Sequence, residues 1–263
     1  MSYYLNWGDI DRLVTATTGA GGTIPAAVAE AIALRDTING WTPPPSPDLA
    51  AIIKRGELTA KNAHKTLTEA LVQPNRSPAD ITHAALGALC DHTAVLVKAH
   101  ADELVESLQK PHAAASAAMA AAAEVVDAQA GAEQALALDG GPEAWRELAQ
   151  ARRVLDQIDV VVEALVEKYE VLGQREPWMH QRNIRHAAMY CATQDSYPAA
   201  YAVLATRNGS GGARGGRWHH APGALKLQLP SRAAELVDDF RQRHIEAEAE
   251  HYAATHGTLP APA

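Results

Sequence analysis

Aromatic side chains and cysteines are scarce in this chain of 263 residues. Aromatic residues make up 5% of it, Phe240 is its one phenylalanine, and Cys90 and Cys191 are its two cysteines. Two cysteines so far apart argue against a disulfide framework and favour a reducing compartment. Much of the apolar content is alanine, which forms helices well but fills cores poorly. We therefore expect long, closely packed helices rather than a thick aromatic core.

Signals for export and for membrane insertion are also missing. Residues 1–6 lack the basic residues of a signal peptide, and no apolar segment of that kind follows. The longest uncharged run in the middle of the chain, PHAAASAAMAAAA at 111–123, is too short and too rich in alanine to span a bilayer. We expect a cytoplasmic protein, or a virion protein if the chain is viral, with no membrane partner.

Several helix starts are marked by a capping residue next to a proline. Thr23 and Pro25 predict a single helix within an N-terminal arm of residues 1–45. Ser-Pro pairs at 46–47 and 77–78 predict two more helices, the first reaching about residue 72 and the second continuing almost to 138. Pro111 is expected to kink or break this second helix, because an internal proline loses a hydrogen bond and clashes with the preceding turn.

The clearest pattern in the chain is an apolar stripe with spacings of three and four residues after the turn DGGP at 139–142. Such spacing predicts a long helix antiparallel to the one before it, because the connection is short. The seam could close within one chain or between chains, and the sequence leaves both possibilities open. Its residues are Leu148, Ala151, Leu155, Ile158, Val162, Leu165, Tyr169 and Leu172.

Strand-like alternation occurs only near the C-terminal third. Leu225, Leu227 and Leu229 alternate with polar residues, and the segment 199–207 has apolar residues at the same period, at 201, 203 and 205. The predicted fold is therefore mainly α, a long antiparallel helical hairpin or bundle with a small β-hairpin arm inserted near residues 199–229. A two-stranded hairpin is marginal alone, so this arm should dock on its own helices or on a neighbouring subunit.

Charge is distributed unevenly along the chain. Residues 175–232 contain eight basic and two acidic residues, a net charge of +6, whereas the whole chain carries −8. We divide the chain into an N-terminal arm with a Pro-rich connector (1–45), an acidic helical bundle (46–174) and a basic module with the β-arm and the C-terminal helix (175–263). Such asymmetry suggests contact with an anionic surface, either nucleic acid or the acidic face of another subunit.

The segment TRNGSGGARGGRWHHAPGALKLQLPS at 206–231 supports three hypotheses. It could be a flexible hinge, an arginine-glycine arm for nucleic acid, or the docking arm just described. As a nucleic-acid arm it would act through Arg182, Arg185, Arg214, Arg217 and Trp218. As a docking arm it would use Leu225, Leu227 and Leu229, together with the N-terminal aromatic residues Tyr3, Tyr4 and Trp7. Arg182, Arg185 and His186 share one helix face, which we expect to be solvated.

Twelve histidines raise the question of a metal site. His244, Glu248 and His251 lie at i, i+4 and i+7 of the last predicted helix, a spacing that could turn them toward one cation. A di-iron bundle needs a second Glu-x-x-His step, which the sequence does not contain. The sequence has no nucleotide-binding loop, catalytic triad or zinc motif to nominate catalytic residues. No cofactor is expected.

These features favour a non-enzymatic structural or assembly protein that contacts subunits of its own kind or neighbouring assembly proteins. Helices that carry a β-arm in an Ala- and Gly-rich chain resemble, in architecture only, the connector and assembly proteins of bacteriophage particles. That resemblance implies a place in a virion, as a head–tail connector or another head or tail component. The alternatives are a nucleic-acid-binding accessory protein using residues 175–232, and a metal-dependent helical enzyme.

Overall fold

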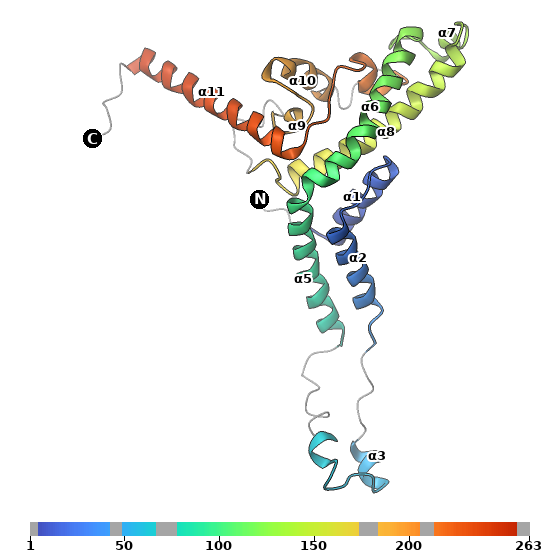
Figure 1. The fold of residues 1–263 in the computed structure, drawn as a ribbon, viewed down its shortest axis with the longest axis vertical. Helices are drawn as coiled ribbons and strands as arrows, with labels where there is room; N and C mark the ends of the chain where they lie inside the picture. Colours follow the sequence, from blue (N-terminus) through green and yellow to red (C-terminus); the bar gives the residue numbers. More distant parts are fainter. Residues whose placement is uncertain (1–4, 43–48, 67–77, 174–183, 206–212, 257–263) are drawn as a thin grey trace. The chain divides into compact units, whose positions relative to one another are not determined.

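The computed structural model describes residues 5–42, 49–66, 78–173, 184–205 and 213–256. The chain forms two compact units, one made of residues 26–93 and the other of the residues before and after them. Within the described ranges every regular element is a helix and no strand occurs, so the predominantly helical prediction is confirmed (Figure 1). None of the described helices combines the length and the apolar character needed to cross a membrane.

The larger unit is built around two long antiparallel helices, α6 (Ala101–Val125) and α8 (Gly141–Glu167), joined through α7 (Ala132–Leu136). The predicted seam of α8 packs mainly against α6 and α1. Leu148, Leu155, Ile158 and Leu165 are among its buried residues, and so are Tyr169 and Leu172 beyond the helix end. The seam therefore closes within the chain, as expected when one apolar stripe faces another.

Of the kink or break predicted at Pro111, the break does not occur, because helix α6 continues through this residue. The interruption lies instead at His100, where α5 (Pro78–Ala99) ends before α6 begins. An internal proline costs about 3 kcal/mol. Burial of large apolar side chains before and after it, Leu104, Leu108 and Met119, offsets that cost.

The N-terminal region contains two helices where the sequence predicted one. Helix α1 (Trp7–Gly19) begins with a capping box, in which Asn6 and Asp9 each accept a hydrogen bond from the backbone N–H of the other. Ile10 and Leu13 are buried where α1 packs on α8. Lys168, just beyond α8, forms an ion pair with Asp9.

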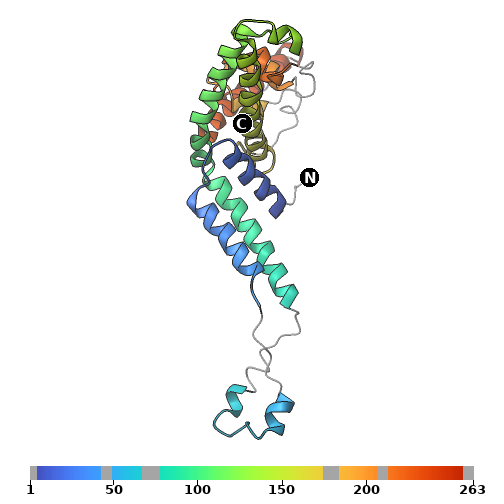
Figure 2. The same ribbon diagram turned by 90° about the vertical axis from the view of Figure 1, so that its right-hand side faces the viewer.

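The smaller unit contains α2 (Ala26–Asn39), the short α3 (Leu49–Lys54) and the first turns of α5. Helices α2 and α5 lie side by side and antiparallel (Figures 1 and 2). The single helix predicted to reach residue 72 is wrong, because α3 ends before Gly56. That glycine has φ +69°, a left-handed conformation that terminates helices. Residues 63–66 are helical again.

The C-terminal region comprises short α9 (Ile184–Ala188), 3-10 turn η2 (Gln194–Ser196), α10 (Tyr197–Ala205), 3-10 turn η3 (Gly216–His220) and the long α11 (Pro230–His256). The predicted β-hairpin near 199–229 is therefore wrong. Its first half is the helix α10. Its second half contains η3 and then an extended segment at 224–229. The backbone N–H groups of Lys226 and Gln228 in this segment donate to the carbonyls of Tyr190 and Met189 at 3.4 and 2.8 Å. The alternation identified a half-buried extended chain but not its partner.

Candidate functional site

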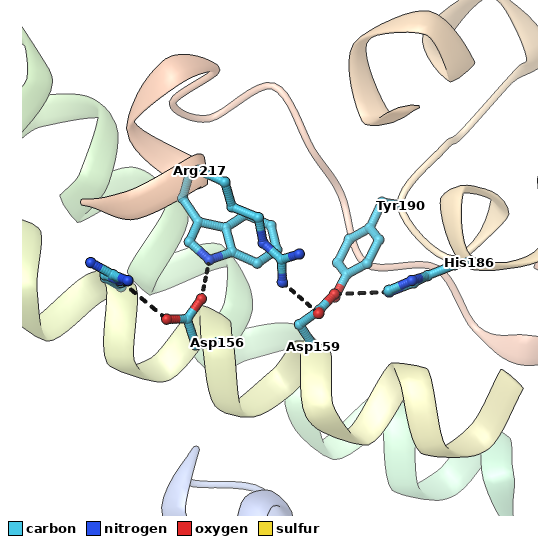
Figure 3. Close-up of polar contacts among 7 residues, drawn as sticks. Asp156, Asp159, His186, Tyr190 and Arg217 are labelled. Atoms are coloured by element: carbon cyan, nitrogen blue, oxygen red, sulfur yellow. Dashed lines mark hydrogen bonds and ion pairs between the residues drawn. The ribbon is translucent and has the colours of Figure 1, made fainter. Parts of the chain in front are cut away.

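A buried carboxylate on α8 forms the centre of a cluster of polar side chains. Asp159 Oδ1 lies 2.9 Å from His186 Nε2 and accepts a hydrogen bond from the Tyr190 hydroxyl at 3.0 Å (Figure 3). Its other oxygen, Oδ2, accepts from Arg217 Nη2 and completes an ion pair. Asp159, His186 and Tyr190 are less than 5% exposed. We call these four residues the Asp159 cluster.

Electrostatics keeps this carboxylate ionised. Burial raises the pKa of Asp159, but the hydrogen bond and charge of His186 and the charge of Arg217 outweigh it and lower the pKa to about 2. An ionised carboxylate only accepts hydrogen bonds, so Nε2 of His186 must carry a proton. Burial and the charge of Asp159 raise the pKa of Tyr190, which therefore remains a donor. All three neighbours act as donors to one anion.

A second row of contacts runs along the same edge of α8. Asp156 accepts from Trp218 Nε1 at 2.7 Å and pairs with Arg152 at 3.2 Å (Figure 3). The Arg214 guanidinium lies 5.3 Å from the centroid of the Trp145 ring. These contacts lay residues 213–218 along α8.

A glycine makes this close approach feasible. Gly216 has φ +61°, and a Cβ atom at this position would lie 2.8 Å from Arg152 Nε. A larger residue would be strained there by its backbone conformation, and the Arg152 side chain would have to shift to make room. Gly216 therefore allows residues 213–218 to pack closely against α8.

The residues predicted to contact nucleic acid are mostly engaged inside the chain. Arg185 is buried and donates to the Val166 carbonyl, and Trp218 is 4% exposed. Arg217 stacks over the Trp218 ring at 4.7 Å in addition to pairing with Asp159. Arg214 is exposed, and Arg182 lies outside the described residues.

The solvated basic face predicted for Arg185 and His186 is wrong, because both side chains are in the interior. The physical reason is the fixed anion: the ionised Asp159 on α8 provides His186 with a buried partner, and the end of α8 provides Arg185 with a carbonyl. Buried polar groups are stable where they find such partners.

The predicted interface residues are likewise largely covered by their own chain. Leu225 and Leu227 are buried, and Leu229 and Trp7 are half-buried. Gln109 of α6 donates to the Leu227 carbonyl at 3.3 Å. Tyr3 and Tyr4 lie outside the described residues.

The proposed metal ligands of α11 do not converge on one point. His244 Nε2 lies 3.3 Å from Glu248 Oε1 on a partly exposed helix surface, and His251 is exposed. The described part of the chain contains no group of three or more His, Cys, Asp or Glu side chains that could hold a metal ion.

A pocket of about 280 Å³ lies between the residues after α9 and the start of α11. Its lining includes residues 191–195 and charged side chains of both signs, among them Arg232, Asp239 and Arg243. Burial raises the pKa of the Cys191 thiol to about 11, so this lining residue is a poor nucleophile at neutral pH. None of the Asp159 cluster residues lines the pocket.

The geometry of the Asp159 cluster suits cohesion rather than catalysis. Its partners come from α9, the following turn and η3, at sequence separations of 27, 31 and 58 residues. The three donors of the cluster, His186, Tyr190 and Arg217, all point to Asp159. The cluster is closed to solvent except at Arg217, which is partly exposed. The cluster therefore fastens the C-terminal region to α8.

The sequence contains one signal for this cluster, although none of the predictions made use of it. Asp159 interrupts the apolar run IDVVVEALV, directly beside the seam residue Ile158. An acid in such a setting needs buried donors. Comparison of the chain with protein-family models, with curated proteins and with solved structures gives no match.

Proposed function

We propose that this chain is a non-enzymatic structural protein that assembles into a homo- or hetero-oligomeric particle through the outer face of α5. The observation that supports this proposal is an outer stripe made of Ile81, Ala84, Ala88 and Val95. Their spacings of three, four and seven residues place them on one helix face. All four are exposed, Ile81 by 39% and Val95 by 64%.

Helix α5 is apolar on its inner face as well. Leu89, Cys90 and Val97 are buried there, with Thr93 among them. A helix with apolar residues on opposite faces is typical of a helix covered on both sides. The outer stripe is therefore the surface of α5 that a partner would cover.

The smaller unit gives a second argument for a partner. Among its described side chains, Val28 and Leu89 are the large aliphatic residues that are buried, whereas Leu34, Trp41 and Ile53 are exposed. Small units with thin cores are commonly stabilised by oligomerisation. Assembly would supply the burial that this unit lacks.

A place in a virion is supported only by the resemblance seen in the sequence. It was suggested by helices carrying a β-arm, and the described residues contain no such arm. The support for assembly now comes from α5. A place as a head–tail connector, or as another head or tail component, would follow from the partner that α5 binds.

Two alternatives have less support. A nucleic-acid accessory protein would depend on the basic segment at 175–232, in which Arg214 is exposed. The other described residues predicted to contact nucleic acid, Arg185, Arg217 and Trp218, are buried or paired within the chain. A metal-dependent enzyme at His244, Glu248 and His251 predicts that the purified chain binds zinc or iron, which elemental analysis would detect.

The test is the mass of the full chain in solution, over a range of concentrations, beside its binding to DNA and RNA across a salt series. We expect an oligomer, and a smaller mass for Ile81→Asp/Val95→Asp with unchanged helicity. Val160→Asp is the matched control, because Val160 is an exposed residue of α8 and is not part of the stripe on α5. A monomer that binds DNA with a steep salt dependence would overturn the proposal in favour of the accessory protein.

A further inference from the structure

We infer that the partner of the outer stripe is the same stripe of a second copy of this chain, packed antiparallel. This inference rests on the proposed function and names its contact. The stripe is centred on Ala88, with Ile81 and Val95 seven residues to either side. A two-fold contact pairs one surface with itself. Ile81 of each copy would then face Val95 of the other, and Ala88 would face its own counterpart.

The size of the side chains fits such a crossing. The middle of the stripe is made of small residues, with Ala84 and Ala88 on it and Gly87 beside them, whereas its ends carry the larger Ile81 and Val95. Space around Gly87 is open, since a Cβ atom there would meet nothing within 4 Å. Small residues allow two helix axes to approach to about 8 Å, while larger ends fill the widening space.

Charged residues select the antiparallel direction. Asp91 and Lys98 occupy the remaining positions of the three-and-four spacing, and both are exposed, as is Asp80 at the start of the helix. Parallel packing would set Asp91 against Asp91 and Lys98 against Lys98. Antiparallel packing about Ala88 separates the two Asp91 residues by about 9 Å along the axis. It also brings Lys98 of each copy beside Asp80 of the other.

The expected dimer is weak. One pair of helices buries less surface than the roughly 1,200–2,000 Å² of a stable interface. We therefore expect a concentration-dependent dimer, with a dissociation constant on the order of micromolar.

Single cysteines in the full chain test the arrangement through a short thiol cross-linker. Ala88→Cys should give a cross-linked dimer. Ile81→Cys and Val95→Cys should not cross-link alone, because like positions are about 21 Å apart, but a mixture of the two variants should. The control is the unaltered chain, whose Cys90 and Cys191 are buried.

A charge exchange tests direction without altering the apolar residues. Asp80→Lys should weaken the dimer by on the order of tenfold, since two favourable pairs become repulsive. The double variant Asp80→Lys/Lys98→Asp should restore it. Asp80 lies in the first turn of α5 and Lys98 in its last turn, where their charges favour the helix. Circular dichroism of each variant therefore measures helicity, and dimer affinities are compared under conditions where helicity is equal.

Failure of the inference is distinct from failure of the proposed function. Cross-linking at all three positions alone would indicate parallel packing and overturn the inference. An oligomer without cross-linking at Ala88 would overturn it too, while the proposed assembly would stand on another surface. A chain that does not self-associate at any concentration also overturns it, and the nucleic-acid measurement then decides the proposed function.

Discussion

Replacement of Asp159 by asparagine tests the interpretation that the Asp159 cluster fastens the C-terminal region to α8. The substitution preserves size but removes the charge that faces the guanidinium of Arg217, whose side chain is 11% exposed. Breaking one side of a buried ion pair costs about 3–5 kcal/mol, because the other charge stays buried without a counter-ion. That loss is a large part of a typical unfolding free energy of about 5–15 kcal/mol.

Asp156→Asn provides the matched control on the same helix edge. The Asp156 side chain is 45% exposed, and its ion pair with Arg152 is a surface pair. Such pairs contribute about 0–1 kcal/mol, and asparagine still accepts a hydrogen bond from Trp218. Urea unfolding of the full chain at pH 7, followed by circular dichroism, compares the two variants. Equal losses of unfolding free energy in the two variants would refute the role of the Asp159 cluster in fastening the C-terminal region to α8.

The pH dependence of the same variant gives a second check. The pKa of Asp159 is lowered to about 2 from its ordinary value of 3.8. Its contribution to stability is therefore full above pH 3.8 and is lost as pH falls toward 2. Asp159→Asn should lack this acid-dependent loss. A variant that retains the same loss would show that other carboxylates cause it.

Two further predictions concern buried titratable groups. Burial lowers the pKa of His112 to about 4, so between pH 7 and pH 5 the unfolded chain binds a proton that the folded chain does not. The free energy of unfolding should therefore fall by about 2 kcal/mol over this range. His112→Leu should reduce that fall in urea unfolding, and an unchanged pH dependence would contradict the role given to His112. Cys90 and Cys191 are buried, so a thiol reagent should modify them slowly in the native chain and rapidly in urea, and fast native labelling would disprove the packing around them.

Local signals predicted several of the helices. Capping and proline signals located the start of α5 at Pro78, and three-and-four spacing alone identified the seam of α8. Helix α1 was not predicted, although Asn6 and Asp9 carry a capping box. The aromatic residues near it obscure the apolar spacing of Ile10 and Leu13. The missed helix α1 could therefore have been predicted from signals that the sequence contains.

Non-local partners account for the other errors. Alternation at Leu225 and Leu227 correctly indicates that one side of the segment is buried. It cannot distinguish a neighbouring strand from the two carbonyls, of Met189 and Tyr190, that accept the hydrogen bonds here. Similarly, the run around Asp159 indicates a buried acid, but its partners His186 and Arg217 lie in segments that share no pattern with α8. Only the tertiary arrangement joins them.

The excess of positive charge in the basic segment gives the sign of its partner but not the partner's location. The structure supplies part of the complementary surface within the chain, since Arg217 faces Asp159 and Arg214 stacks on Trp145. Such internal pairing leaves less charge for a nucleic acid, whose affinity rises with the number of phosphates neutralised. The assembly contact proposed on α5 is mostly apolar instead. Its association should therefore depend on salt only through the end pairs of Asp80 and Lys98, and a steep salt dependence would indicate that the basic segment carries the contact.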